Sequence, residues 1–400
     1  MNVIFVNHNS FASNSAGHIF HLANELARLG VDCTVGVPAD VHTLDELGAA
    51  DFRACTYEDL LRTPPRDGPT LVHAWTPREI VRRCTETLST RLGCPYVVHL
   101  EDNEESILAR TLGVSVSDLR RRADLEVPDS LTHPVRYRSF LAGAAGVTAL
   151  IDRLFEFKPE GVPGQVFWPA FDPALGWGRP PDEGLRQRIG LRAGERVVVY
   201  TGNVHPSNQR EMSSLYLALA LLRRRGVPLR LVRTGTDHVL PYEVPLAEVM
   251  GEMVINLGQQ PRTELPAIVS LADVLVQPGG PDAFNDYRFP SKLPEFLASG
   301  RPVLLPRSNI GHHLVEGEQC VLLEVGNALE IARKLEPLLA DEERRRRIGA
   351  AGRAFAVQNL SWKKAAHDLM AFYESLVRPR QRQSGRDGER ALPQDRSMVR

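Results

Sequence analysis

The sequence lacks three features that would place it in other classes of protein. Its five cysteines, Cys33, Cys55, Cys84, Cys94 and Cys320, are odd in number and never spaced as C-x-x-C, which argues against a disulfide framework and against a zinc site. No apolar run approaches the roughly 18 residues that a membrane-spanning helix needs. The start, MNVIFVNHNS, has no basic leader, so we expect no signal peptide. Together these absences favour a reducing, cytoplasmic location.

The chain also has almost no net charge and very little lysine. Its 48 Lys and Arg residues nearly balance 49 Asp and Glu residues, which gives a formal net charge of -1. This balance argues against a nucleic-acid partner, because such proteins carry an excess of basic charge. Only five of the 48 basic residues are Lys, so the place of each lysine is informative. With 400 residues, the chain is long enough for two domains.

Two common phosphate-binding motifs are missing. The sequence has no G-x-x-x-x-G-K-[ST], and the loop after its first apolar run, NHNSFASNSAGHIF, lacks G-x-G-x-x-G, which argues against a nicotinamide cofactor. That loop nevertheless reaches Gly17 where a helix should begin, and glycine lets a backbone approach a phosphate or a sugar closely. Ser15 and Gly17 are therefore candidate substrate-binding residues, although a plain polar loop explains the serines equally well.

Short apolar runs alternate with helical patterns along the chain. VIFVNH, CTVGVP, LVHAW, YVVHLED and GVTAL occur in the first 150 or so residues, and a second series, RVVVYTGN, LRLVRTGTD, VINLGQ, VLVQPGG, PVLLP and CVLLEV, follows a Gly-, Pro- and Arg-rich stretch. Continuous apolar strands between helices are typical of parallel sheets covered on both faces. The pattern predicts an α/β fold with two Rossmann-like, doubly wound domains that face each other across a cleft.

The domain boundaries follow from these patterns. We predict domains over residues 1–172 and 195–360, joined by a linker, and a helix over 361–377 that returns toward the first domain. Helical periodicity covers 327–339, 341–358 and 361–376, with Gly349 and Gly352 expected to loosen the middle helix. The Arg-rich, apolar-poor tail 378–400 is expected to be disordered. It is either an unselected tail or a weak adhesive for an anionic membrane surface.

One segment concentrates candidate functional residues: DAFNDYRFPSKLPEFLASGRPVLLP, residues 282–306. It follows an apolar strand pattern, and a helix is expected to start at Pro290 and Ser291, so that Ser291, Lys292 and Glu295 share its first turns. A helix N-terminus at the carboxyl edge of a parallel sheet favours an anion, and Lys292 adds a positive charge. We predict that nucleotide phosphates bind here and that Glu295 accepts hydrogen bonds from the ribose; a solvated helix start with an ion pair is the alternative.

Four stretches of the sequence resemble a known family. PSKLPEFLASGRPV, ADVLVQPG, VVVYTGN and LRLVRTGTD are similar to segments of the retaining GT-B glycosyltransferases, which include sucrose synthases, glycogen synthases and bacterial mannosyltransferases. The resemblance covers roughly residues 1–376 and is most specific over 197–305. It implies a nucleotide-sugar donor bound mainly by the second domain, a glycan or lipid-linked acceptor bound mainly by the first domain, and neither a metal ion nor a cofactor.

The sequence departs from the family pattern at the first member of a Glu-x(7)-Glu pair. Glu295 matches the second member, whereas Tyr287 occupies the position of the first. In many members the first Glu contacts the sugar. The resemblance therefore implies that this chain binds the sugar through Asn285, Asp286 or backbone groups instead.

A second departure concerns the diphosphate. The family usually supplies an Arg and a Lys after the glycine that corresponds to Gly202, and here Asn203 and Asn208 stand at those positions. Arg210, Arg288 and Lys292 can compensate, because a departing diphosphate needs its developing charge neutralised. The alternative is a degenerate site that binds no donor.

Two consecutive strand patterns, LVHAWTPRE and YVVHLEDNEE, end in ionisable residues. The resemblance places Glu101 where the family often has a His near the reacting sugar carbon, with Asp102 next to it, and we predict that one of these two carboxylates is catalytic. A carboxylate that caps the following helix is an equally good explanation. His73 and His99 are candidate substrate-binding residues, with a buried core position as the alternative.

The sequence as a whole predicts a retaining, metal-independent glycosyltransferase that acts on a glycan or glycolipid. A catalytically silent partner in a glycan assembly complex, and a nucleotide-sugar epimerase or hydrolase on the same fold, remain alternatives. The Arg runs 120–122, 223–225 and 344–347 are expected to be solvated helix faces. The first run is also a candidate for peripheral contact with a lipid diphosphate or the inner membrane face.

Overall fold

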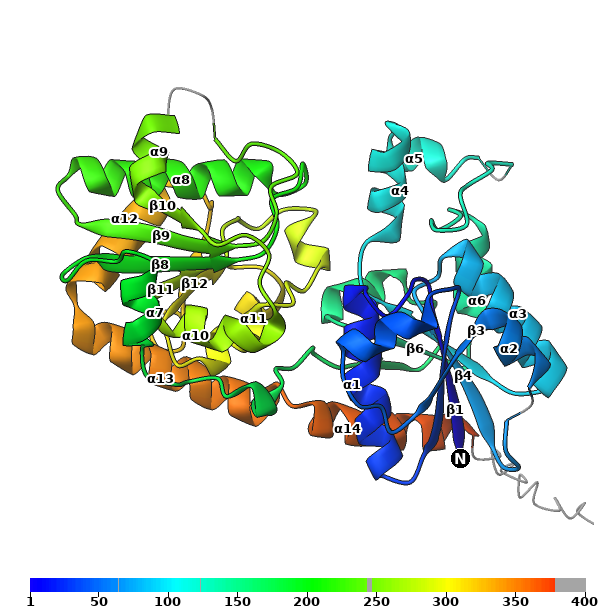
Figure 1. Ribbon diagram of the computed structural model, residues 1–400. Helices are drawn as coiled ribbons and strands as arrows, with labels where there is room; N and C mark the ends of the chain where they lie inside the picture. The colour runs from blue at the N-terminus through cyan, green and yellow to red at the C-terminus, as the bar shows by residue number, and fades with distance from the viewer. Residues whose placement is uncertain (64, 123, 243–246, 378–400) are drawn as a thin grey trace, which may run out of the picture.

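Two parallel sheets, each flanked by helices, form two domains that lie side by side (Figure 1). The computed structural model describes residues 1–63, 65–122, 124–242 and 247–377. Every named strand pairs in parallel with its neighbours. The predicted fold class is therefore confirmed.

The first domain contains a seven-stranded sheet in the order β3-β2-β1-β4-β5-β6-β7. Its strands are β1 (Asn2–Asn7), β2 (Asp32–Val37), β3 (Arg53–Thr56), β4 (Thr70–Trp75), β5 (Tyr96–Leu100), β6 (Gly146–Ala149) and β7 (Gly164–Val166). Its helices are α1 (Asn14–Arg28), η1 (Val41–Glu46), α2 (Tyr57–Arg62), α3 (Glu79–Leu92), α4 (Glu104–Leu112), α5 (Val116–Leu119), α6 (Arg136–Ala142) and η2 (Asp152–Phe157). The edge strands β3 and β7 escaped prediction because they are short and carry partly exposed residues.

The second domain contains a six-stranded sheet in the order β10-β9-β8-β11-β12-β13. Its strands are β8 (Arg196–Thr201), β9 (Leu229–Thr234), β10 (Val254–Asn256), β11 (Val274–Val276), β12 (Val303–Pro306) and β13 (Val321–Leu323). The helices from the linker to the end of the described chain are η3 (Pro173–Leu175), α7 (Glu183–Arg188), α8 (Gln209–Arg224), α9 (Ala247–Met253), η5 (Arg262–Glu264), α10 (Leu265–Ser270), η6 (Asn285–Tyr287), α11 (Leu293–Ala298), η7 (Asn309–His313), α12 (Ala328–Ala340), α13 (Glu342–Asn359) and α14 (Trp362–Val377).

The strand order reverses once in each sheet, and each reversal marks a place for a ligand. In the first sheet β1 pairs with both β2 and β4, and in the second β8 pairs with both β9 and β11. In open parallel sheets, ligands bind in the crevice at the carboxyl ends of the strands on either side of such a reversal. The loops that follow β1, β4, β8 and β11 are therefore the places to look for a site.

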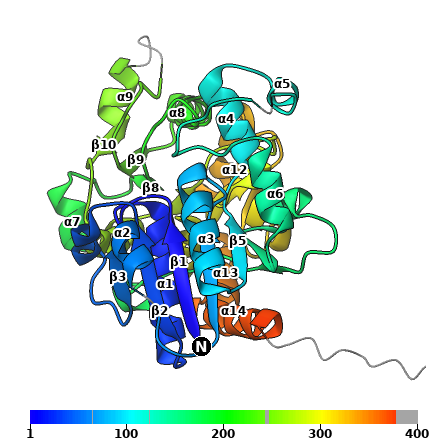
Figure 2. The same cartoon turned by 90° about the vertical axis from the view of Figure 1, so that its right-hand side faces the viewer.

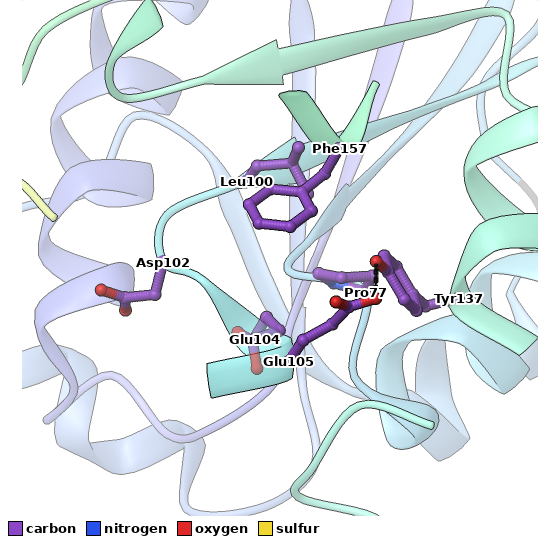
Figure 3. A pocket seen from close by; sticks show the side chains of 7 residues that line it. All are labelled: Pro77, Leu100, Asp102, Glu104, Glu105, Tyr137 and Phe157. Atoms are coloured by element: carbon purple, nitrogen blue, oxygen red, sulfur yellow. Dashed lines mark hydrogen bonds between the residues drawn. The ribbon is translucent and has the colours of Figure 1, made fainter. Parts of the chain in front are cut away.

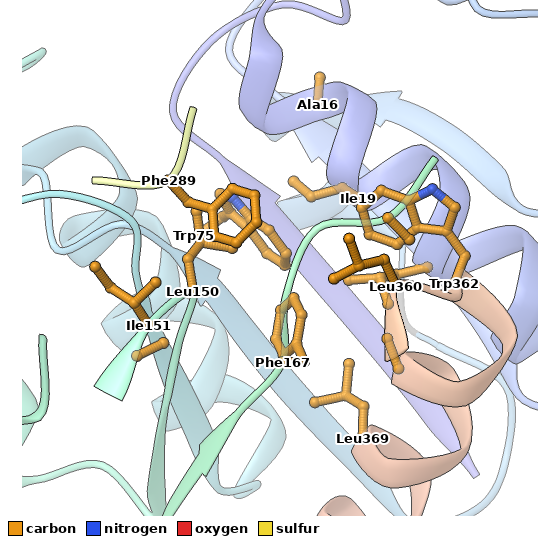
Figure 4. Close-up of a cluster of buried hydrophobic side chains, with 14 of the residues drawn as sticks. Ala16, Ile19, Trp75, Leu150, Ile151, Phe167, Phe289, Leu360, Trp362 and Leu369 are labelled. Carbon is orange, nitrogen blue, oxygen red and sulfur yellow. The ribbon is translucent and has the colours of Figure 1, made fainter. Parts of the chain in front are cut away.

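Helices α13 and α14 connect the second domain back to the first. The apolar side chains of α14 pack beside α1, and Figure 4 shows Trp362 and Leu369 of α14 in one cluster with Ile19 of α1. The same cluster includes Phe289 of the second domain, which lies beside Trp75. Figure 2, which views the first domain from the front, shows α14 beneath it. The two domains thus share a continuous apolar contact.

The glycines of α13 serve packing and do not loosen the helix. A Cβ atom at Gly349 would lie 2.0 Å from the carbonyl oxygen of Gly300, and one at Gly352 would lie 2.7 Å from that of Gln319. Only glycine permits helix and backbone to approach so closely. The expectation of a weakened helix was wrong, because tertiary contact decides what these glycines do.

Arg345 also differs from its prediction as a solvated residue. Its side chain is buried and donates to the carbonyl oxygens of Leu338 and Leu339 at 2.7 and 2.8 Å, so it caps the end of α12. Arg120 to Arg122 are exposed as expected.

The tail 378–400 lies outside the described residues. Among the helices that the structure describes, none is both long and apolar enough to span a membrane.

Candidate functional site

Several of the predicted site residues lie at or after the carboxyl ends of strands from both domains. Gly202, Asn203 and Asn208 follow β8, the segment 285–295 follows β11, and Glu101 and Asp102 follow β5. Arg288 of the second domain is close enough to Asp102 of the first to influence its pKa. The candidate site therefore spans the two domains.

Lys292 lies at the centre of the second domain's contribution. Its Nζ is 4.0 Å from the centroid of the Tyr200 ring, a cation–π contact. A Cβ atom at Gly202, whose φ is +128°, would lie 2.8 Å from this Nζ, so glycine lets the ammonium reach the backbone after β8. Within the described part of the chain, Lys292 forms no ion pair or hydrogen bond. Burial and then the positive charge of Arg288 lower the pKa of Lys292 to about 7.

Arg288 is held firmly next to Lys292. Its Nε donates to Asn285 Oδ1 at 3.0 Å, its Nη2 donates to Glu211 Oε2 at 3.3 Å, and its guanidinium lies 4.4 Å from the centroid of the Phe284 ring. Two positive side chains are thus kept close to each other, which costs electrostatic free energy unless an anion sits between them. This arrangement can bind a diphosphate.

Asn203 and Asn208, which stand where the resemblance leads one to expect a basic pair, hold the loop after β8. Asn208 Nδ2 donates to the carbonyl oxygen of Asn203 at 3.0 Å, and Asn203 Oδ1 accepts from the backbone N–H of Thr236 at 2.8 Å. Their side chains are therefore engaged in shaping the loop. Arg210 lies exposed in the first turn of α8, and the structure does not bring it to Lys292.

The segment around Ser291 is not helical where the sequence predicted it to be. Helix α11 begins at Leu293, and Lys292 is its N-cap residue, because Pro294 is accommodated in the first turn of the helix. Ser291 is exposed before the helix. Glu295 is buried, and its Oε1 accepts from Arg262 Nη2 at 2.8 Å. A ribose would have to share or replace that contact.

Asn285 and Tyr287 do not face an open sugar site. The amide nitrogen of Asn285 donates to Glu211 Oε1 at 2.7 Å and to the carbonyl oxygen of Gly280 at 3.1 Å. The hydroxyl of Tyr287 donates to Glu156 Oε2 in the first domain at 2.5 Å. Asn285 thus supports the loop, and Tyr287 joins the two domains.

Glu101 is buried in the first domain as a fixed negative charge. Its carboxylate accepts a short hydrogen bond from the Ser15 hydroxyl of α1, and its Oε1 lies 3.2 Å from Nδ1 of His18. Burial opposes ionisation, but hydrogen bonding and electrostatic interaction with His18, together with His99 and the Ser15 hydroxyl, hold the pKa of Glu101 below its usual range. Both Ser15 and Glu101 are therefore occupied with each other.

Asp102, next along the chain, has the opposite character. Burial, reinforced by the negative charges of Glu104 and Glu101, raises its pKa to about 7. No described residue forms a hydrogen bond with its carboxylate. Figure 3 shows that the carboxylate points away from the hydrogen-bonded pair of Glu105 and Tyr137. A carboxylate poised near neutral pH can exchange a proton with a substrate.

Asp102 also lines a small pocket, which has room for about one water molecule. Its lining residues are Pro77, Leu100, Asp102, Glu104, Glu105, Tyr137 and Phe157 (Figure 3). The pocket is too small to hold a sugar ring. We therefore do not take it as the substrate site.

His73 and His99 are part of the core, so the prediction that they bind substrate is wrong for this structure. Both are 0% exposed. His73 Nδ1 lies 2.5 Å from the Tyr373 hydroxyl of α14, and its Nε2 lies 2.9 Å from Thr148 Oγ1. His99 Nδ1 also contacts Thr148 Oγ1, at 2.8 Å. Burial lowers the pKa of both residues, so they are neutral polar links between β4, β5, β6 and α14.

Gly17 lies in the first turn of α1, and a Cβ atom there would meet nothing within 4 Å. Packing within the protein therefore does not explain the glycine. Approach by a ligand stays a prediction.

Sequence reasoning missed His8, His18, Arg78 and Glu211. His8 and Arg78 follow β1 and β4, and Arg78 Nε donates to the buried Glu104 at 3.2 Å. Burial and then Arg78 lower the pKa of His8 to about 4. The position of His8 and Arg78 just past strand ends was a usable signal. Glu211 gave no signal in the sequence, because only the fold brings it to Arg288.

No group of three or more His, Cys, Asp or Glu side chains in the described ranges is arranged to hold a metal ion.

Comparisons with known proteins show that the chain is similar to glycosyltransferases. Residues 195–341 match the family described as Glycosyl transferases group 1. The GDP-mannose-dependent alpha-(1-6)-phosphatidylinositol monomannoside mannosyltransferase of Mycolicibacterium smegmatis is 30% identical over 245 residues, which cover 59% of each chain. Its counterpart in Mycobacterium tuberculosis is 31% identical over 271 residues, which cover 65% of each chain. The matches thus span less than two thirds of these relatives.

Among solved structures, Anabaena HepE in complex with UDP has a TM-score of 0.69 and 16% sequence identity, and the match covers 94% of this chain and 100% of HepE. HepE has also been solved with UDP-glucose, with a TM-score of 0.68. At this sequence identity the likeness shows a shared fold.

Proposed function

Because residues 195–341 match the family described as Glycosyl transferases group 1 and the two-domain fold is shared with HepE, we propose that the chain is a GT-B glycosyltransferase that transfers a sugar from a nucleotide-diphosphate donor to a hydroxyl group of a glycan or glycolipid. We further propose that the transfer retains the configuration of the anomeric carbon and needs no metal ion. The same reasoning assigns donor binding mainly to the second domain and acceptor binding mainly to the first.

The observation that carries this proposal is the pair of Lys292 and Arg288. Cleavage of a nucleotide sugar places negative charge on the departing diphosphate, and preorganised positive groups stabilise that charge most effectively in a partly buried site. Lys292 has no counter-ion among the described residues, and Arg288 is fixed beside it. These two side chains supply the charge that Asn203 and Asn208 cannot supply.

Asp102 is the better candidate of the two predicted catalytic carboxylates. Glu101 is already ionised and hydrogen-bonded to Ser15, whereas Asp102 has a pKa near 7 and no partner among the described residues. A group that accepts the proton of the acceptor hydroxyl needs a pKa near the working pH. In a retaining transfer the acceptor approaches from the side on which the diphosphate departs. Asp102 lies close enough to Arg288 for the guanidinium to influence its pKa, so a base at Asp102 would lie on the side of the proposed diphosphate site.

For the acceptor, we propose a hydroxyl group of a lipid-linked molecule at an anionic membrane surface. The exposed residues Arg110, Arg121 and Arg122 lie in and beside the α4–α5 segment of the first domain, which projects from the sheet (Figure 1). Each basic residue near an anionic bilayer contributes about 1 kcal/mol to binding. Flotation with vesicles that contain or lack phosphatidylglycerol tests this: we expect binding to the anionic vesicles only, reduced in Arg121→Glu/Arg122→Glu, and equal binding to both vesicle types would refute it.

The activity is tested with purified protein, a panel of GDP- and UDP-sugars and an acceptor extract, with and without a chelator. We expect binding of one nucleotide family and transfer of the sugar with retained configuration, detected by NMR of the product, unchanged by the chelator. If no nucleotide binds, the result would favour a catalytically silent partner protein, in which Asn203 and Asn208 cannot supply the positive charge that a donor diphosphate needs. Isomerised donor, or free nucleotide released without an acceptor, would favour an epimerase or a hydrolase.

A further inference from the structure

Glu211 is a carboxylate beside the pair of positive charges, and neither the family pattern nor the sequence pointed to it. It lies in the first turn of α8, and its side chain is only 13% exposed. Oε1 accepts from Asn285 Nδ2 at 2.7 Å, and Oε2 accepts from Arg288 Nη2 at 3.3 Å. Both oxygens are therefore used within the protein.

The contacts of Glu211 extend into a network around Arg288. Asn285 Oδ1 accepts from Arg288 Nε at 3.0 Å, and the carbonyl oxygen of Asn285 accepts from Asn309 Nδ2 at 3.2 Å. The ring of Phe284 lies against the guanidinium, 4.4 Å from its carbon atom. Arg288 is thus restrained by two hydrogen-bonding side chains and one aromatic ring. Asn285 and Phe284 belong to the 279–289 loop, whereas Glu211 belongs to α8.

The backbone of that loop is shaped to receive Glu211. Gly279 has a φ of +130°, and a Cβ atom there would lie 3.1 Å from Glu211 Oε1. A side chain at this position would press on the carboxylate and displace it. The close approach of Gly279 therefore keeps Glu211 within reach of Asn285.

A negative charge in this place works against anion binding unless it has another task. It repels a diphosphate at close range, and burial raises the pKa of Glu211 while Arg288 opposes that shift. The task that the geometry supports is orientation. Without Glu211, the guanidinium would lose one of its partners, and the side-chain amide of Asn285 would lose its shortest hydrogen bond.

We propose that Glu211 is a positioning residue of the donor site, which aims the Arg288 guanidinium directly and through Asn285 and does not itself touch the donor. This inference rests on the proposed function, because it assigns Arg288 to the diphosphate. Glu211 also helps to set the charge of Lys292. The groups that act on that ammonium are the positive Arg288 and Arg233, the negative Glu211 and Glu295, and the ring of Tyr200.

The first test is calorimetric binding of GDP and UDP to the full chain and to Glu211→Gln and Glu211→Ala. For whichever nucleotide binds, we expect affinity to fall by about tenfold in both variants, since one charge-assisted hydrogen bond is lost. Glu252→Gln, a change of an exposed Glu in the same domain, is the matched control and should bind as the unaltered protein does. Tighter or unchanged binding in Glu211→Gln would overturn the proposal.

The second test does not depend on a nucleotide. The chain has five lysines, so reductive methylation with a carbon-13 label gives few signals, and Lys292→Met identifies the signal of Lys292. We expect the titration midpoint of Lys292 to move to lower pH in Glu211→Gln, because a neighbouring negative charge has been removed. A residue that only supports folding would lower the melting temperature and leave this midpoint in place, which would overturn the proposal. If the unaltered protein binds no nucleotide, the donor-site function fails, and this titration still decides whether Glu211 governs the two charges.

Discussion

Replacing Lys292 by Met should weaken binding of the nucleotide diphosphate and remove most of its pH dependence. Methionine keeps an unbranched apolar side chain against Tyr200 and removes only the charge. The pKa of Lys292 is lowered to about 7 by burial and then by Arg288, so at that pH its side-chain amine carries the extra proton in about half of the free protein molecules. A bound diphosphate favours the charged form, so binding takes up a proton above pH 7.

The magnitude follows from these charges. Two unit charges 4 Å apart in a partly buried site attract by about 4 kcal/mol, and desolvation reduces this to the roughly 2–3 kcal/mol expected of a charge-assisted hydrogen bond. That corresponds to affinity about 30- to 150-fold weaker in Lys292→Met at pH 7. In the unaltered protein, the charged fraction of Lys292 falls from about one half to about one hundredth between pH 7 and 9. Because the uncharged form should still bind as Lys292→Met does, this should weaken binding by roughly 20- to 40-fold.

The assay is isothermal titration calorimetry of the preferred nucleotide at pH 7, 8 and 9, in two buffers of different ionisation enthalpy so that proton uptake is measured directly. The terminal phosphate is already ionised over this range. Lys364→Met removes an exposed lysine of α14 that pairs with Asp368 and serves as the control. Affinity that stays level from pH 7 to 9 in the unaltered protein, or an equal slope in Lys292→Met, would refute the reasoning.

Four further predictions concern catalysis, domain contact and packing. Asp102→Asn should lower kcat by about 10²- to 10⁴-fold. The folded-state pKa of Asp102 is raised to about 7, so the ionised carboxylate destabilises the folded protein above that pH. Urea denaturation should therefore show that the variant gains about 1 kcal/mol in free energy of unfolding at pH 8 and nothing near pH 4. Tyr287→Phe removes the hydroxyl that bonds Glu156 and should lower kcat a few-fold with donor affinity unchanged; tenfold weaker donor binding would argue instead for sugar contact. Gly349→Ala places a Cβ atom 2.0 Å from the carbonyl oxygen of Gly300 and should cost about 2–3 kcal/mol in urea denaturation. A chelator should leave transfer rates unchanged, and loss of activity restored by a divalent cation would contradict metal independence.

Much of the second domain's part of the candidate site could be predicted from local sequence. Lys292 and Glu295 stand out because they follow an apolar strand pattern in one short segment, and chain neighbours stay neighbours after folding. The helix start was misplaced by two residues, since local preference fixes helix ends only approximately. Asn203 and Asn208 were identified as departures from the family, but their engagement with each other and with Thr236 required the folded loop.

The sequence by itself determined the two α/β domains, because continuous apolar runs between helical patterns leave few other ways to bury the strands. It also determined which loops carry polar residues. Tertiary structure alone decided which of those residues meet. Glu211 and Arg288 are 77 residues apart, and His73 and Tyr373 are 300 residues apart. Contacts at such separations depend on how whole elements pack. That packing assigned His73 to the core, brought Glu211 to Arg288, and left Asp102 without a hydrogen-bonding partner among the described residues.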